Sequence, residues 1–454
     1  MTPPDTIAAI ATAPGRGAIG VIRVSGAEVP RIGEAILGTL PTPRVARLSR
    51  FLGAGGETLD QGLALYFPAP SSYTGEHVLE LQGHGGALIL DVLLRRLLGL
   101  GCRMARPGEF SERAFLNGKI DIAQAEAIAD LIDAGTTAAA RAAVRTMQGE
   151  FSARIAQLQS GITELRVYVE AAIDFPDEEL DFLNDAALSG RLTSIFKAFD
   201  SITAAAQQGA LLREGLNVVI AGLPNAGKSS LLNRLAGDEV AIVAELPGTT
   251  RDLLRQHVHL DGLPLNLVDT AGLRSTADAV EAEGVRRARS AIARADRILY
   301  IVDAGAGAAG AASEEPWAAE LRSLPPGVPV TLVFNKIDLT GSAGRVEASL
   351  IPPRVYLSAR TGAGLDLLRA HLKAGVGYIE GEAGALSARR RHLDALNRAR
   401  GNVEAAAGIL QSTRAFELFA EDLRLAQRNL SEITGEFTSE DLLGEIFGSF
   451  CIGK

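Results

Sequence analysis

Gly222-Leu223-Pro224-Asn225-Ala226-Gly227-Lys228-Ser229 is the stretch that decides the fold of this chain. It fits Gly-x-x-x-x-Gly-Lys-Ser/Thr, the pattern of the phosphate-binding loop. The apolar run 216–221 before it predicts a buried strand, and residues 230–235 after it predict a helix. Glycines let such a loop turn its N–H groups toward phosphate, and the helix N-terminus adds positive potential. The sequence therefore predicts a P-loop nucleotide site, in which Lys228 reaches the β- and γ-phosphate oxygens and Ser229 binds Mg²⁺.

Shorter motifs follow in the order of a guanine-nucleotide site. Residues 269–272 (Asp-Thr-Ala-Gly) end an apolar strand and suit Mg²⁺ and γ-phosphate contact, and residues 247–252 offer a Thr to Mg²⁺. Residues 335–338 (Asn-Lys-Ile-Asp) end another strand, and Asp338 can accept hydrogen bonds from the N1–H and amine of guanine. Adenine lacks both, and a site built on such bonds rejects the mismatched base by about 10⁴–10⁵-fold. Because Ser-Ala at 358–359 would contact the guanine carbonyl through backbone N–H, the set predicts a Ras-like GTP-binding domain.

Hydrolysis needs a water-orienting group that the usual position does not supply. Leu273 stands where many GTPases carry Gln. An unaided Ras-type site hydrolyses GTP at about 10⁻⁴–10⁻³ per second, and an arginine finger adds about 10³–10⁵-fold. Asn225 could ligate a monovalent cation such as K⁺ in place of the finger. Glu281 is a candidate for positioning water, and a solvated helix residue is the alternative interpretation.

Composition limits the class of protein. The chain has 454 residues, enough for about three domains, and a formal net charge of −9, so any RNA contact must use a local patch or shape. Cys102 and Cys451 are its only cysteines, which excludes a disulfide framework and indicates a reducing compartment. No signal peptide and no apolar stretch of membrane-spanning length are found, so we expect a cytosolic protein. The chain has only six lysines and uses Arg for most of its positive charges. A lysine that is retained in such a chain can mark a place where a compact ammonium is required, which favours functional roles for Lys119 and Lys454.

Pattern changes along the chain predict its domains. Residues 1–118 mix strands, turns and a helix, which predicts an α+β domain with Arg16, Glu76, His84 and Arg113 at the tips of Gly-rich turns. Helical periodicity runs over 119–212 and again over 379–454, on either side of a GTPase domain at 213–378 with a hairpin turn at 261–262. We expect the GTPase domain to be an insertion in one all-α domain. The basic cluster within 389–400 is a solvated helix face by default, and tRNA contact is the sharper interpretation.

The chain resembles the MnmE (TrmE) family of tRNA-modification GTPases over nearly its full length. The resemblance is carried by residues 14–17 through 23–26, 72–76, 106–119 and 247–252, and by the tail Cys451-Ile452-Gly453-Lys454. The run 106–119 and the tail are highly specific, because other GTPases share the nucleotide motifs but lack both.

The resemblance implies an N-terminal domain that binds formyl- or methylene-tetrahydrofolate and dimerises, and an inserted α/β GTPase domain that pairs with its copy across K⁺. It also implies a heterotetramer with the FAD-containing protein MnmG. Together the two proteins would install an aminomethyl or carboxymethylaminomethyl group on C5 of the wobble uridine of certain tRNAs. A GTPase switch in ribosome or RNA assembly is the alternative. A bound folate would favour the first function, whereas a KH-like unit with a Gly-x-x-Gly loop would favour the second, and none follows residue 378.

The candidate site residues fall into four groups. Lys228, Glu281 and Cys451 are the catalytic candidates, although the resemblance assigns Cys451 no role. A free thiol beside a cationic tail could have a lowered pKa, and a small buried hydrophobe is the alternative interpretation. By motif match, the resemblance implies that folate is contacted by Arg23, Glu80, Lys119 and Lys454. Mg²⁺ would be bound by Ser229 and Thr250. K⁺ would be bound by Asn225, by Thr249 and by the 244–246 loop through Ala244 and Leu246. The nucleotide set is Asn225, Ala226, Gly227, Lys228, Ser229, Ser230, Thr249, Thr250, Asp269, Thr270, Ala271, Gly272, Asn335, Lys336, Asp338, Ser358 and Ala359.

Overall fold

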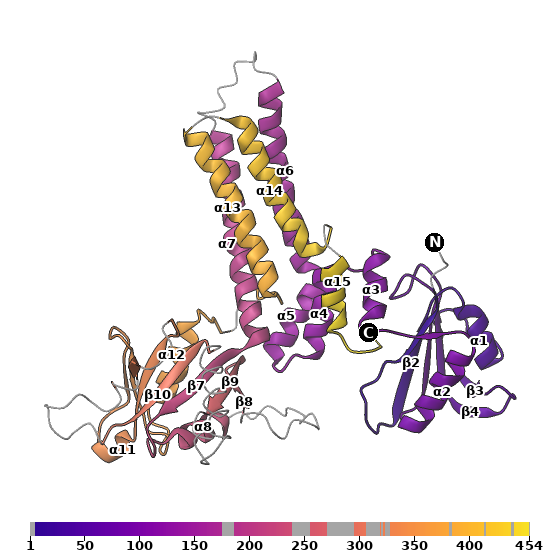
Figure 1. Cartoon of the computed structure of the whole chain (residues 1–454), viewed down its shortest axis with the longest axis horizontal. Helices are drawn as coiled ribbons and strands as arrows, with labels where there is room; N and C mark the ends of the chain where they lie inside the picture. Colours follow the sequence, from indigo (N-terminus) through magenta and orange to yellow (C-terminus); the bar gives the residue numbers. More distant parts are fainter. Residues whose placement is uncertain are drawn as a thin grey trace. The chain divides into compact units, whose positions relative to one another are not determined.

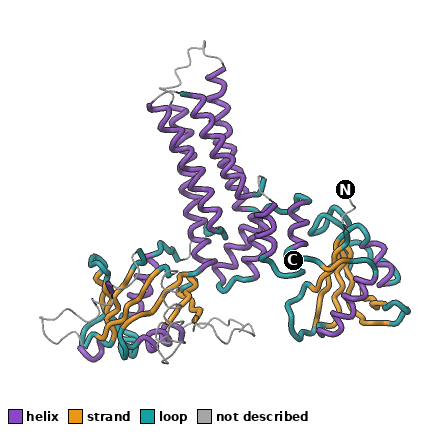
Figure 2. Tube along the Cα trace, in the orientation of Figure 1, coloured by secondary structure: helices purple, strands orange, loops and turns teal. Residues whose placement is uncertain are grey.

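The computed structural model describes most of the chain (Figures 1 and 2), namely residues 5–174, 186–237, 255–269, 295–305, 318, 321–322, 327–380, 384–412, 415–436 and 440–453. The chain divides into two compact units. The first consists of Met1–Ala129, Met147–Leu192 and Asn397–Lys454, and the second of Asp130–Thr146 and Thr193–Leu396.

The first unit contains a six-stranded sheet with the order β3-β4-β5-β2-β1-β6. Side chains alternate across each strand, so the sheet has two distinct faces. Helices α1 and α2 cover one face, over a core that includes Ile22, Phe51 and Leu81, and Phe110 of α3 packs on Ala9 of the other face. The elements are β1 Ile7–Ile10, β2 Ile19–Ser25, α1 Val29–Leu37, β3 Arg47–Leu52, β4 Thr58–Phe67, β5 Val78–His84, α2 Ala87–Gly99, β6 Arg103–Met104 and α3 Glu109–Leu116.

Helices make up the rest of the first unit. Helices α6 and α14 run side by side (Figure 1), and Gln159 Nε2 of α6 donates to Ser431 Oγ of α14 at 2.8 Å. Phe447 and Phe450, in and just after α15, pack on Ile122 of α4. In the part of the chain that the structure describes, the helices between and after the two sheets that belong wholly or partly to this unit are α4 Ile122–Ile132, α6 Glu150–Asp174, α7 Ala186–Glu214, α13 Arg390–Ser412, α14 Phe416–Thr434 and α15 Glu440–Gly448, and α5 Thr137–Met147 lies almost wholly in the second unit.

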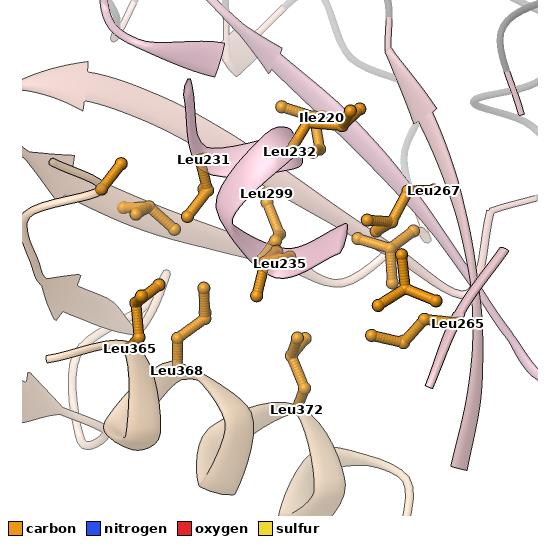
Figure 3. Close-up of a cluster of buried hydrophobic side chains, with 14 of the residues drawn as sticks. Ile220, Leu231, Leu232, Leu235, Leu265, Leu267, Leu299, Leu365, Leu368 and Leu372 are labelled. Carbon is orange, nitrogen blue, oxygen red and sulfur yellow. The ribbon is translucent and has the colours of Figure 1, made fainter. Parts of the chain in front are cut away.

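The second unit contains a seven-stranded sheet with the order β12-β13-β11-β10-β7-β9-β8. Its interior strands are parallel, and β8 and β12 are antiparallel edge strands. Leu231 of α8 and Leu368 of α12 pack with Leu265 and Leu299 of the sheet (Figure 3). The elements are β7 Leu216–Gly222, α8 Lys228–Gly237, β8 Arg255–Leu260, β9 Leu263–Asp269, β10 Arg297–Asp303, β11 Val330–Asn335, α11 Ile337–Thr340, β12 Arg345–Glu347, β13 Arg354–Tyr356 and α12 Leu365–Gly375.

The predicted fold class is confirmed: an α+β part, an all-α part and an α/β P-loop domain are all present. The predicted hairpin turn is also confirmed, since Asp261 and Gly262 join β8 to β9 with φ angles of 50° and 90°. Positive φ at both positions of a two-residue loop matches the twist of the strands. Lys373 Nζ donates to the Asp261 carboxylate at 2.6 Å and Tyr378 Oη to its carbonyl at 3.1 Å, so the turn is anchored near the end of α12.

Candidate functional site

The phosphate-binding loop joins β7 to α8 and is closely packed by its neighbours. Gly222 and Gly227 have φ angles of 139° and 94°, where side chains are strained. A Cβ on Gly227 would lie 2.3 Å from Asn335 Nδ2, and one on Gly222 would lie 2.3 Å from the Ile301 carbonyl oxygen. Asn225 lies between them in the left-handed region, with φ at 62°. The glycines of the motif are therefore required by packing as well as by backbone conformation.

Lys228 is buried against its own loop. Its Nζ donates to the carbonyl oxygens of Gly222 and Leu223, both at 2.9 Å. Ser229 and Ser230 follow in the first turn of α8, and both are exposed. A helix N-terminus carries a partial positive charge, and the Lys228 ammonium adds a full one beside it, so both attract anions. This arrangement can receive the β- and γ-phosphates of a nucleotide.

Asn335 connects the phosphate-binding loop with the turn after β13. This side chain is 2% exposed. Its Nδ2 donates to the Ala226 carbonyl at 3.0 Å, and its Oδ1 accepts from the Ala359 N–H at 2.9 Å. One buried amide thus joins segments that lie more than a hundred positions apart in the chain.

Asp338, predicted to recognise the base, is held in place by its neighbours. Ser358 Oγ donates to its Oδ1 at 2.6 Å, and Arg360 lies 3.9 Å from its Oδ2. An ionised carboxylate with one oxygen oriented by a hydroxyl keeps acceptor capacity for a pair of N–H donors. The backbone N–H of Ser358 donates to the Ala363 carbonyl at 2.8 Å and that of Ala359 to Asn335, so the expected contact of this turn with the guanine carbonyl stays a prediction.

Asp303 is a residue of this site that the sequence interpretation missed. It ends β10, at the sheet edge where β7 and β11 also end. Lys336 Nζ donates to Asp303 Oδ2 and to the Asn225 carbonyl, both at 2.7 Å. Burial raises the pKa of the Asp303 carboxyl, but hydrogen bonds from Lys336 and the Gly305 N–H outweigh it and leave the pKa below its ordinary value. The strand ending itself was the signal that could have identified Asp303.

Several predicted site residues cannot be placed. Asp269 ends β9, but its side chain is outside the described residues. Also outside the described residues are Ala244, Leu246, Thr249, Thr250, Thr270, Ala271, Gly272, Glu281 and Lys454.

Arg23 and Glu80, predicted to contact folate, form a cross-strand pair in the first unit. They are partners in the β2–β5 register, and Arg23 Nε donates to Glu80 Oε1 at 3.0 Å. The guanidinium carbon lies 5.6 Å from the ring centre of Tyr73 and 5.8 Å from that of Phe110. Because both charged side chains stay partly exposed, at 24% and 18%, they can still meet a ligand.

Lys119 follows α3 and is exposed above the turn at Gly75. A Cβ on Gly75 would lie 3.2 Å from Lys119 Cε and 2.9 Å from Asn117 Cβ. Asn117 Nδ2 in turn donates to the Thr74 carbonyl at 2.6 Å. The turn at 74–76 therefore supports the Lys119 side chain from below.

Arg113 differs from its prediction. We expected it at the tip of a Gly-rich turn, but it lies in α3 and is 9% exposed. It is paired with the carboxylates of Asp5, Glu76 and Glu109. The run looked like a turn because it is rich in Gly and polar residues, and because two of the acidic partners of Arg113, Asp5 and Glu76, are distant in the sequence.

The C-terminal tail lies against the sheet of the first unit. The Gly108 N–H donates to the Cys451 carbonyl at 3.3 Å, and Pro107 and Ile452 form a β-bridge. Gly453 is packed so closely that a Cβ there would lie 2.5 Å from the Ile10 carbonyl oxygen. Cys451 is exposed, so the interpretation of this residue as a buried hydrophobe is wrong.

The basic cluster at 389–400 is largely paired with acids. Arg389 lies 3.2 Å from Asp130, Arg398 lies 2.5 Å from Glu432, and Arg400 lies 2.9 Å from Glu404. The Arg398 and Arg400 pairs fit a solvated helix face better than a free nucleic-acid surface, whereas the Arg389 pair is largely buried. Separately, none of the helices in the described ranges combines the length and apolar character needed to cross a membrane.

Comparison with known proteins covers the whole chain. A family model described as the MnmE helical domain matches residues 122–451, and one described as the N-terminus of the GTP-binding protein TrmE matches residues 6–119. A tRNA modification GTPase MnmE from Methylococcus capsulatus is 57% identical over 450 residues, covering 99% of each chain. Another, from Yersinia pseudotuberculosis, is 56% identical over 457 residues and covers 100% of each.

Among solved structures, the G domain of the T. maritima FeoB iron transporter is 26% identical over 36% of this chain and 96% of that one, with a TM-score of 0.25. At that TM-score the likeness adds nothing to what the sequence relatives contribute.

Proposed function

The chain belongs to the MnmE family of tRNA modification GTPases, and from this premise we propose that it is a K⁺-activated GTP hydrolase that drives modification of a tRNA wobble uridine. In this proposal it works with an FAD-containing partner to add an aminomethyl or carboxymethylaminomethyl group to C5 of that uridine. The family membership favours this function over a GTPase switch in ribosome assembly.

The observation that carries the GTPase part is the pair of bonds made by Asn335. They hold the Ala226 carbonyl and the Ala359 N–H in one fixed relation, so the phosphate end and the base end of the nucleotide site are built as one piece. Lys228 would then move from its loop carbonyls to the phosphates, and Asp338 would accept from the guanine edge. The backbone that Asn335 fixes needs no such movement when charge develops on the phosphates.

The residues at the loop fit metal ions. Asn225 and Ser229 both carry oxygen ligands and are exposed, and oxygen is the ligand that hard cations take. In the proposal Ser229 and Thr250 hold Mg²⁺, and Asn225 with Thr249 and the 244–246 loop holds K⁺. The bound cations would neutralise charge on the phosphates. Glu281 is proposed to orient the attacking water.

The residues of the first unit fit a folate. The Glu80 carboxylate can accept from pterin N–H groups, and the Lys119 ammonium is exposed for a glutamate carboxylate. Tyr73 and Phe110 provide an apolar support behind Arg23. The bound tetrahydrofolate would supply the one-carbon unit. We assign Arg23, Glu80, Lys119 and Lys454 to its binding, with residues 1–118 as the folate-binding and dimerisation domain.

The partners and the location belong to the same proposal. We expect a cytoplasmic homodimer that assembles with the FAD-containing protein MnmG and acts on tRNA. The helical domain would be formed by 119–212 and 379–454, with the GTPase domain at 213–378. Cys451 is exposed in the tail and remains a catalytic candidate without an assigned step.

Mass spectrometry of tRNA wobble nucleosides tests the proposal. Cells that lack this protein should lose the aminomethyl-type uridines, and the wild-type chain should restore them. The Lys228→Ala variant should not restore them, because the phosphates lose their ammonium partner. Unchanged wobble nucleosides together with accumulating ribosomal precursors would instead support the assembly switch.

A further inference from the structure

We propose that Arg113 is a positioning residue for the folate site, acting through the loop at residues 72–76 on both Arg23 and Lys119. The inference rests on the proposed folate-binding function and deepens it. Arg113 would touch no ligand, and its effect would pass through Glu76.

Arg113 is at the centre of a charge network in which its own side chain, Glu76 and Glu109 are largely buried and Asp5 is half exposed. Its Nη1 donates to Glu76 Oε2 at 3.0 Å and to the Asp5 carbonyl at 2.7 Å. Its Nη2 donates to Asp5 Oδ1 at 2.7 Å and to Glu109 Oε1 at 3.1 Å. Breaking one side of so buried a pair leaves a charge without compensation, which is strongly unfavourable. The network therefore determines where the Glu76 carboxylate lies.

Glu76 passes that constraint to the rest of the loop. Ser25 Oγ donates to Glu76 Oε2 at 2.7 Å, and it lies 2.7 Å from Thr74 Oγ1. Ser25 and Thr74 are completely buried. Buried hydroxyls that have lost their partners are costly, so the loop and the end of β2 are fixed to each other.

The loop supports Arg23 on one side. Tyr73 stands next to Thr74, and its ring lies 5.6 Å from the Arg23 guanidinium. Tyr73 Oη lies 2.8 Å from Ser111 Oγ of α3, so the ring is held at both ends. A ring fixed beside a partly exposed guanidinium limits the orientations that the guanidinium can take.

The same loop supports Lys119 on the other side. Thr74 accepts from Asn117 Nδ2 at its carbonyl oxygen, at 2.6 Å, and Gly75 lies directly under the Lys119 side chain. Gly75 has a φ of 79°, in the left-handed region, and forms the turn between Thr74 and Glu76. The position of this turn therefore depends on the hydrogen bonds that Thr74 and Glu76 make. The two cations assigned to folate therefore share one support, and Arg113 holds that support through Glu76.

Arg103 provides a matched control within the same network. It pairs with Asp5 and Glu109, as Arg113 does, but within the described part of the chain its guanidinium donates to no residue of 72–76. Loss of Arg103 therefore weakens the network without releasing the loop. A general loss of domain stability would affect both variants, whereas a positioning effect separates them.

Calorimetric titration of the full-length protein with 5-formyl-tetrahydrofolate tests the inference. Arg113→Met should weaken binding by about tenfold or more, because ordering of the ligand's two cationic partners is lost. Arg103→Met should stay within about twofold of wild type, and Arg113→Lys should recover part of the affinity, since an ammonium can still pair with Glu76. GTP affinity, read on the second unit, should stay unchanged in all three variants. Equal weakening in Arg113→Met and Arg103→Met would overturn the inference.

A double-mutant cycle with Lys119→Ala measures the coupling in folate affinity between Arg113 and Lys119, which a merely structural role of Arg113 would not produce. If Arg113 acts through Lys119, its loss should cost less folate affinity in the Lys119→Ala background than in wild type. Full additivity would contradict that route. Failure of the proposed function is distinguishable, because wild-type protein would then show no folate binding at all.

Hydrogen exchange at residues 72–76 adds a ligand-free test: protection should fall in Arg113→Met and not in Arg103→Met, and unchanged protection would also overturn the inference.

Discussion

Asn335 and Ala226 are joined by a buried hydrogen bond of 3.0 Å from the Asn335 Nδ2 to the Ala226 carbonyl. The close packing at Gly227 accompanies this bond, since a Cβ there would lie 2.3 Å from the same Nδ2. The shape of the phosphate-binding loop thus depends on the end of β11, which precedes the predicted base-recognition residue Asp338. This bond couples the position of the loop to that strand end.

Asn335→Ala should weaken GTP and GDP binding alike. It removes partners from the Ala226 carbonyl and the Ala359 N–H, and each such bond contributes about 0.5–1.5 kcal/mol. The summed loss corresponds to roughly tenfold or more in affinity. Titration with a fluorescent guanine nucleotide measures it. Lys373→Met, which alters the distant hairpin anchor, is the control and should bind as wild type. Unchanged affinity in Asn335→Ala would show that the link does not shape the site.

Asp338→Asn should change which base the site accepts. The carboxylate accepts two N–H groups of guanine, whereas an amide offers one acceptor and presents N–H to the guanine amine. GTP affinity should fall by at least about 100-fold, because polar groups are left unpaired. Xanthosine triphosphate has a carbonyl where guanine has its amine, so its affinity should rise. Ser358 can still donate to the amide oxygen, and ATP should stay a poor ligand. Competition among the three nucleotides gives the result directly.

Local patterns were sufficient to predict the elements around the nucleotide. The β7–loop–α8 unit and the Asp261-Gly262 turn were both predictable, because glycine position and strand periodicity act over a few residues. The strand end at Asn335 followed for the same reason, whereas the short helix α11 that carries Asp338 was not predicted. Fold class could therefore be inferred from short stretches taken one at a time.

Tertiary pairing was what the sequence could not supply. Arg113 meets Asp5 and Glu76, which lie 108 and 37 positions away, and no local pattern relates such distant charges. Asp303 was missed because its role depends on Lys336, which follows a different strand. The placement of the tail beside Gly108 likewise required the structure, since a four-residue motif carries no information on its contacts.

Acid should destabilise the first unit through Glu109. Burial raises the pKa of this carboxyl, but hydrogen bonds from Arg103, the Arg106 N–H and Arg113 outweigh burial and hold it below its ordinary value of 4.5. A folded pKa below the unfolded value means that the stabilisation is present above pH 4.5 and is lost as pH falls through the folded pKa. The free energy of unfolding should therefore fall as pH drops below about 4.5.

Glu109→Gln provides the comparison for that acid effect. The variant should be less stable than wild type near neutral pH and should show a smaller fall in acid, because the titrating group is gone. Denaturant unfolding followed at several pH values between neutral and acid measures both. An identical acid slope in the two proteins would exclude Glu109 as a source of the effect.

The two cysteines should differ sharply in reactivity. Cys102 is buried, and burial raises the pKa of its thiol to about 12, so almost none of it is the reactive thiolate near neutral pH. Cys451 is exposed. A thiol reagent should therefore modify Cys451 in the native protein and reach Cys102 only after unfolding. Mass spectrometry of the modified peptides checks this order, and rapid labelling of native Cys102 would contradict it.

Gly108→Ala should loosen the C-terminal tail. Gly108 has a φ of 65°, and a Cβ there would lie 2.4 Å from the Phe447 carbonyl oxygen, a backbone atom that cannot rotate away. The left-handed conformation alone costs an alanine about 1–2 kcal/mol, and the contact adds to that cost. The Gly108 N–H would shift from the Cys451 carbonyl, so hydrogen exchange over residues 447–453 should rise. Gly401→Ala, inside α13 with nothing within 4 Å, should leave tail exchange unchanged and stabilise its helix by about 0.5–1 kcal/mol. Equal tail protection in both variants would mean that Gly108 does not hold the tail.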